Sequence, residues 1–197
     1  MYKTTLTSLK LTDKHIPLTL QLFRAHFSSE LSSYKEFINQ SSQNIISIQN
    51  KFEELYNSEI ETTVESDDEP KDDYWNYEHY KVHEIFPSFY RQSTFIGLYS
   101  FFETRLHSLC EKMQRIKEYK IKLSDISGDN NTEKSKKYLQ LVVGIDTVDL
   151  NYLWAKIADY RKIRNCLVHH NGHTKKQEDW EGIIRRINHI ELISNRI

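Results

Sequence analysis

Apolar residues recur at steps of three and four along most of the chain, which is the spacing that places side chains on one face of an α-helix. The first such stretch runs from Pro17 to about Asn57 and predicts one long helix. Its apolar stripe consists of Leu20, Phe23, Phe27, Leu31, Tyr34, Ile38, Ile45, Ile48, Phe52 and Leu55. From residue 58 to residue 73 the sequence turns acidic and loses this period, so we expect an acidic loop or insertion there.

A second helical pattern begins at Tyr74 and continues to about Lys120. Pro87 lies within it, and because proline has no backbone N–H, we expect a break or kink at that position. The part after Pro87 is the most apolar stretch of the chain and predicts a central core helix. Its stripe consists of Phe95, Leu98, Tyr99, Phe102, Leu106, Leu109 and Met113.

Two further helices are predicted after a loop at residues 124–133. The first spans about residues 134–143. The second extends from Thr147 to His170, with Asp146 or Thr147 as its N-cap. Asn171-Gly172 is expected to end it, because glycine is common just after a helix C-terminus.

Thr174 and Gln177 have capping-box spacing for a last helix. Its predicted core face consists of Trp180, Ile183, Ile184, Ile187 and Ile190. Taken together, the patterns predict a single all-α domain over residues 1–197, an up-and-down bundle of four to five helices with a long N-terminal helix.

Composition narrows the class of protein. Five glycines and three prolines in 197 residues are too few for a β-sandwich, a barrel or a many-looped α/β fold. The sequence has no run of eighteen apolar residues and no signal-peptide pattern at its start, so no membrane association is expected. Cys110 and Cys166 are isolated and lack CxxC spacing, which fits a reducing compartment and predicts a cytoplasmic protein.

Charge is distributed unevenly along the chain. Residues 1–104 hold nine Lys/Arg against sixteen Asp/Glu, a net charge of −7, whereas residues 105–197 hold eighteen against twelve, a net of +6. The formal total of −1 argues against a histone-like protein, whose affinity for nucleic acid comes from overall positive charge. The asymmetry is compatible with an anionic partner for the second half and equally with surface helices that simply differ in charge.

The helix predicted over 147–170 departs from a simple amphipathic pattern. Its apolar stripe begins with Leu150, Leu153, Trp154 and Ile157. At about 100° per residue, Arg161, Arg164 and Asn165 return to the same stripe. Because an unpaired buried charge is costly, these groups must line a cleft or an interface, or else form an internal ion pair, for which Glu103 on the edge of the central helix's stripe is a candidate.

Three histidines follow at the end of this helix. His169 lies four residues after Asn165, so the two side chains can meet, and it lies in the last turn, where the carbonyl end of the helix favours a cation. His169 and His173 are four residues apart and His170 is adjacent, but Gly172 is expected to end the helix between them. No carboxylate or cysteine lies in a ligand-like register nearby, so no metal site is predicted there. Phosphate loops and serine-nucleophile elbows are absent from the sequence, and Cys166 is expected to pack rather than to attack.

The segment from Arg164 to His169 reads R-N-x-x-x-H and is followed by His170-Asn171-Gly172. It resembles the R-x4-6-H motif of the HEPN superfamily, whose members are helical bundles with the motif near the end of a late helix. The aromatic, glutamate-containing stretch FFETRLHSLC adds to the likeness, which covers about residues 80–193. The resemblance implies an RNA-binding, metal-independent endoribonuclease that needs no cofactor, of the kind found as toxins of toxin–antitoxin pairs or as antiviral-defence effectors.

The resemblance also implies roles for individual residues. His169 would act as general acid or base, Arg164 would hold the phosphate, and Asn165 would orient the histidine or contact a phosphate oxygen. Arg161, His170 and His173 would extend the phosphate-binding surface. Two protomers typically pair their motif helices in one composite cleft, so a homodimer is expected, with an antitoxin or regulatory protein as a further partner. The alternative is a non-catalytic HEPN-like dimerisation or nucleotide-binding module, or an unrelated helical interaction protein.

Overall fold

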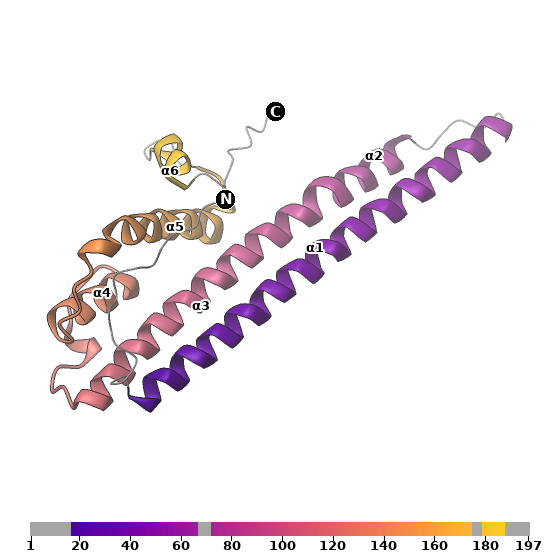
Figure 1. Ribbon diagram of the computed structural model, residues 1–197. Coiled ribbons are helices and arrows are strands. Elements are labelled where there is room, and N and C mark those ends of the chain that lie inside the picture. Colours follow the sequence, from indigo (N-terminus) through magenta and orange to yellow (C-terminus); the bar gives the residue numbers. More distant parts are fainter. Residues whose placement is uncertain (1–16, 67–71, 175–178, 188–197) are drawn as a thin grey trace. The chain divides into compact units, whose positions relative to one another are not determined.

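The computed structural model describes residues 17–66, 72–174 and 179–187, and within these ranges every regular element is a helix (Figure 1). The α-helices are α1 (Leu18–Ser66), α2 (Asp72–Tyr80), α3 (Phe86–Lys117), α4 (Asn131–Leu141), α5 (Asn151–His170) and α6 (Trp180–Ile187). Two short 3₁₀ turns, η3 (Leu123–Asp125) and η4 (Val148–Leu150), precede α4 and α5. The predicted all-α class is confirmed. In this part of the chain no helix is long and apolar enough to cross a membrane.

A single π-helical turn, η2 (Lys81–Ile85), joins α2 to α3 without interrupting the helix. Its position follows from Pro87. In a regular α-helix the carbonyl of His83 would accept a bond from residue 87, but proline has no N–H to donate. The widened turn adapts to this loss, and the Phe86 N–H bonds back to the carbonyl of Lys81. The break expected at Pro87 is therefore a local change of helical pitch.

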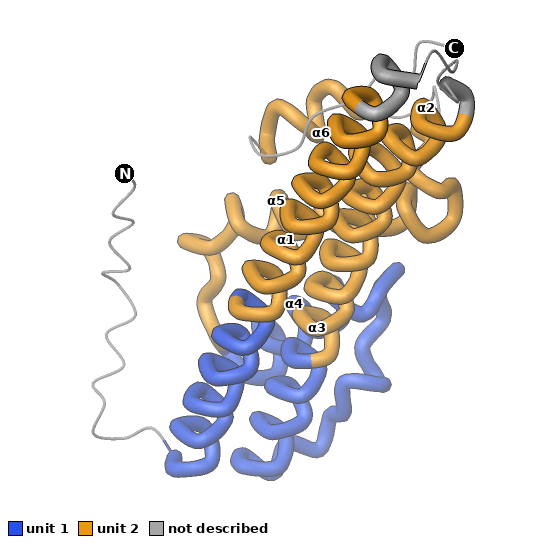
Figure 2. The backbone as a smooth tube through the Cα atoms, turned by 90° about the vertical axis from the view of Figure 1, so that its right-hand side faces the viewer, with its two compact units in different colours: residues 1–35, 105–144 blue, residues 36–104, 145–197 orange. Residues whose placement is uncertain are grey.

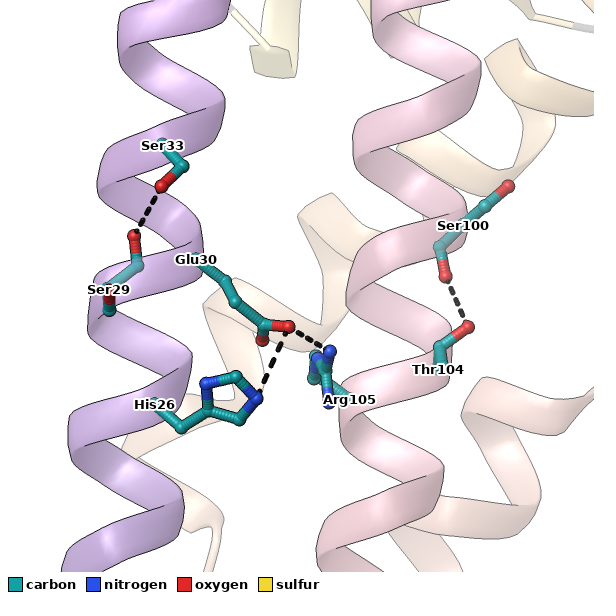
Figure 3. Close-up of polar contacts among 7 residues, drawn as sticks. All are labelled: His26, Ser29, Glu30, Ser33, Ser100, Thr104 and Arg105. Atoms are coloured by element: carbon teal, nitrogen blue, oxygen red, sulfur yellow. Dashed lines mark hydrogen bonds and ion pairs between the residues drawn. The ribbon is translucent and has the colours of Figure 1, made fainter.

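The chain divides into two compact units, to both of which α1 and α3 contribute (Figure 2). Unit 1 comprises residues 1–35 and 105–144. Its α4 is capped by Asn130, whose side chain accepts from the Glu133 N–H, and buries Tyr138 fully. Within this unit α1 and α3 are joined by the ion pair between Glu30 and Arg105, whose side chains point toward each other in Figure 3.

Unit 2 comprises residues 36–104 and 145–197. Here the later part of α1 runs beside α2, η2 and the first part of α3, and the Tyr90 hydroxyl donates to the Ile38 carbonyl. A second packing layer joins α5 and α6 around a buried isoleucine cluster. The cluster consists of Ile163, Ile183 and Ile187, with Phe95, Tyr160, Leu167 and Trp180 packed against it.

Several predicted boundaries were wrong. The helix α1 continues to Ser66, so the first part of the segment expected to be an acidic loop is helical, which accords with the helix-forming glutamates Glu59 and Glu61. Residues 67–71 lie outside the described residues. The last helix begins at Trp180, and its N-cap is Asp179, whose carboxylate accepts from the Gly182 N–H at 2.9 Å, rather than Thr174. Gln177 and Ile190 lie outside the described residues.

Candidate functional site

The helix α5 carries all the residues of the R-x4-6-H motif. Its N-cap is Leu150, which makes no side-chain capping bond, rather than the predicted Asp146 or Thr147, and its C-cap is Asn171. At the start, the Asp146 carboxylate accepts from the Val148 N–H at 2.9 Å, and η4 then leads into the helix at Asn151. At the end, Asn171 adopts the left-handed conformation with φ of 49°, and Gly172 follows with φ of 79°. The predicted termination at Asn171-Gly172 is confirmed. It fixes the helix end directly after His169 and His170.

The buried side of α5 is formed by Asp159, Ile163 and Cys166. Asp159 is only 7% exposed and accepts two hydrogen bonds from Arg186 of α6, at 2.7 and 2.9 Å. This hydrogen bonding, together with the charge of the carboxylate, raises the pKa of Arg186. Cys166 packs as expected, and its thiol donates to the His173 carbonyl.

The stripe predicted to face the core therefore lies on the opposite side of α5. Leu153 and Val168 on that side are 38% and 43% exposed, so Leu153 is not a packed core residue. Arg161, Arg164 and Asn165 are half-buried there.

Arg164 and Asn165 are in direct contact. The Arg164 Nη1 donates to the Asn165 Oδ1 at 3.2 Å. The Nε of Arg164 is shielded from solvent and has no hydrogen-bond partner among the described residues. Among the described residues neither Arg161 nor Arg164 forms an ion pair, so the internal pair of either arginine with Glu103 is not formed. Glu103 lies half-buried on α3. The guanidinium of Arg164 thus has an unused donor at Nε.

The three histidines differ in exposure. His169 and His173 are exposed and His170 is half-buried. The rings of His169 and His170 are 6.5 Å apart between centroids, at 62°. The backbone N–H of His173 donates to the His170 carbonyl at 2.8 Å, so the turn after α5 keeps His173 near the helix end. The structure thus brings the motif residues onto one helix end, while Arg164 and His169 point in different directions around α5.

Sequence reasoning missed a separate cluster in unit 2, formed by Glu53, His79 and His83. One potential ligand atom from each residue lies within 4.8 Å of the other two. The two histidines are four residues apart, a spacing that the sequence shows plainly. The third residue, Glu53, comes from α1, which lies earlier in the chain. These residues offer a metal-ligating set that the motif helix does not.

Comparisons with protein-family models, with curated proteins and with solved structures find no match to this chain.

Proposed function

We propose that the chain is a metal-independent endoribonuclease of the HEPN type that acts as a toxin or antiviral-defence effector. The observation that carries the proposal is the state of Arg164. Its guanidinium is half-buried, touches an amide and forms no ion pair among the described residues. An arginine held in this way is available to a phosphate, which its forked donors fit well. His169 lies exposed in the same two turns of helix and can exchange protons with a bound substrate.

The chemistry requires few protein groups, because RNA supplies its own nucleophile. The ribose 2′-oxygen attacks the adjacent phosphorus and loses its proton to a base, while the bond from phosphorus to the 5′-oxygen breaks and that oxygen gains a proton. His169 serves as one of the two proton-transfer groups, an effect of roughly 10²–10⁴ in rate. Arg164 stabilises the charge that develops on the non-bridging oxygens. The products are a 2′,3′-cyclic phosphate and a 5′-hydroxyl.

A dimer explains how groups on different sides of one helix can act on one phosphate. Arg164 and His169 are five residues apart, roughly 140° around an ideal helix. If two copies of α5 pack about a two-fold axis, Arg164 of one and His169 of the other reach the same cleft. The exposed Val168, one turn after Arg164, supplies apolar area for such a contact.

The proposal is tested with purified protein and total RNA or tRNA, with and without EDTA. We expect cleavage in both conditions and products that carry 2′,3′-cyclic phosphate and 5′-hydroxyl ends. A 5′-phosphate product, or cleavage that EDTA abolishes, would contradict the mechanism.

A second function, a non-catalytic module that binds a partner protein, is favoured by a different observation. Unit 2 exposes many large apolar side chains, among them Leu55, Phe89, Tyr77 and Tyr80, at 56–63% exposure. Exposed apolar area of this kind is typical of protein-binding surfaces. Absence of any RNA cleavage by a well-folded dimer would favour this function over the first.

A further inference from the structure

The cluster of Glu53, His79 and His83 lies where two helical segments of unit 2 run side by side. Glu53 comes from α1, His79 from α2 and His83 from the π-turn η2. The His83 Nε2 is 3.0 Å from the Glu53 Oε1, and the two imidazole rings are stacked with centroids 4.4 Å apart. From these contacts we propose that the three residues form a binding site for a divalent transition-metal ion of the zinc class, independent of the proposed RNA cleavage.

The state of His83 points to a missing ligand. Its Nε2 is shielded from solvent and has no hydrogen-bond partner among the described residues. The nearby Glu53 oxygen is within range, but the two atoms are not aligned for a hydrogen bond. A buried polar atom without a partner is costly, and a metal ion between the nitrogen and the carboxylate would satisfy both.

The surroundings hold the two rings in place. Phe52, which is 7% exposed, contacts His79 and His83 edge-on, with centroid distances of 5.8 and 5.9 Å. Trp75 packs against the same phenylalanine at 5.7 Å. This aromatic wall limits the rotamers open to both histidines, and preorganised ligands lose less freedom when they bind an ion. His79 is exposed, so the site has an entrance from solvent.

The backbone contributes as well. His83 is the residue whose carbonyl would need the absent N–H of Pro87, and the π-turn that results sets the direction of its side chain. Single π-turns of this kind are frequent at functional sites. The register that places His83 opposite Glu53 therefore depends on Pro87.

The donor set selects the class of ion. Two imidazole nitrogens and one carboxylate oxygen suit zinc and its neighbours in the first transition row, whereas magnesium and calcium prefer all-oxygen sites. Three protein ligands leave a fourth tetrahedral position for water or another molecule. The ion would also join α1 to the segment formed by α2 and η2.

The test is calorimetric titration of metal-free protein with Zn²⁺. The protein carries His169→Ala and His173→Ala, which leaves His170 as the single histidine near the end of α5. We expect one ion per chain, and a dissociation constant raised at least roughly 10²-fold by His79→Ala or Glu53→Gln, since even indirect ligand partners cost 10–100-fold. Saturating Zn²⁺ should raise the melting temperature by roughly 5–10 °C in the parent and not in these variants.

The matched control is His107→Ala, which removes an exposed histidine of unit 1 that lies near Glu111, and it should leave Zn²⁺ binding unchanged. Co²⁺ provides a second readout, because its visible spectrum reports nitrogen coordination and should disappear with His79→Ala. His79 and Glu53 are both partly solvent-exposed, so their variants should fold. No Zn²⁺ binding by the parent, or equal affinity in the parent and His79→Ala, would overturn the site.

Discussion

The guanidinium of Arg164 has no carboxylate partner among the described residues. It lies half-buried on α5, its Nη1 contacts the Asn165 amide, and its Nε has no partner among the described residues. Arg186, by contrast, is paired with the buried carboxylate of Asp159. The contrast between these two arginines is the main local reason for the proposal that Arg164 binds substrate.

We predict that Arg164→Ala lowers the rate of RNA cleavage by roughly 10²–10³-fold, because charge stabilisation is often the largest catalytic contribution. Arg164→Lys should also cleave RNA slowly, since an ammonium group does not reproduce the forked contact with a phosphate. Melting temperatures should stay close to that of the parent protein. Arg115→Ala, at a residue of unit 1 that is 75% exposed, is the control and should retain full activity. Loss of folding in both Arg164 variants would instead make this residue structural.

Cys110 is the most deeply buried thiol, and its environment predicts a pH dependence. Its residue is fully buried, and burial raises the pKa of the thiol from 9.0 to about 11. The unfolded chain loses this proton from about pH 9, whereas the folded chain keeps it until about pH 11. Burial also raises the pKa of Tyr138, which acts in the same direction.

The free energy of unfolding should therefore fall as the pH rises from about 9 to about 11. Cys110 contributes at most roughly 2–3 kcal/mol to this decrease. Cys110→Ser should remove that contribution, so that the free energy of unfolding depends less on pH. Denaturant titrations of both proteins across this pH range measure the effect. Parallel curves for the two proteins would show that the thiol is not the cause.

At the scale of elements, α6 depends on few contacts. It has eight residues, too short to be stable alone, and it is held by Ile183, Ile187 and the pair between Arg186 and Asp159. Truncation of Arg186 would leave the Asp159 carboxylate buried without its ion-pair partner.

We predict that Arg186→Ala lowers the melting temperature clearly more than Arg185→Ala does. Arg185 is the matched control because its pair with Glu181 is 81% and 78% exposed and contributes little. Differential scanning calorimetry of the two variants makes the comparison. Equal melting temperatures would mean that the bidentate pair does not hold α6 in place.

The sequence predicted most helices correctly because their signals are local. Asn171-Gly172 acts through its own backbone chemistry and ends α5 as expected, whereas Pro87 produces a π-turn in a continuous helix rather than a break. The buried face of α5 was predicted wrongly, since this helix has apolar residues on both sides: Leu150 and Val168 on one, Ile163 and Cys166 on the other. Periodicity does not say which side another helix will cover.

The cluster with Glu53 could not be found in the same way. The spacing of His79 and His83 is visible in the sequence, but the position of Glu53 opposite them depends on the register between α1 and η2. That register is set by side-chain packing around Phe52 and by the π-turn, neither of which has a periodic signal.

At the scale of the whole molecule, the exposed apolar side chains favour association of two copies of the chain. We predict a two-fold dimer in which two copies of α5 meet, and light scattering at tens of micromolar should give twice the mass of the chain. Val168→Asp should yield monomers, because it places two like charges near the symmetry axis. A parent protein that is monomeric and fully active would contradict the composite site.

The most direct test of the proposed ribonuclease is the rate of RNA cleavage in EDTA by the parent protein, His169→Ala and His107→Ala. Both histidines are exposed on helices, so neither substitution should affect folding. We predict that His169→Ala is slower by roughly 10²-fold or more, as expected for a lost proton-transfer group, and that His107→Ala matches the parent. A fully active His169→Ala protein would contradict the account.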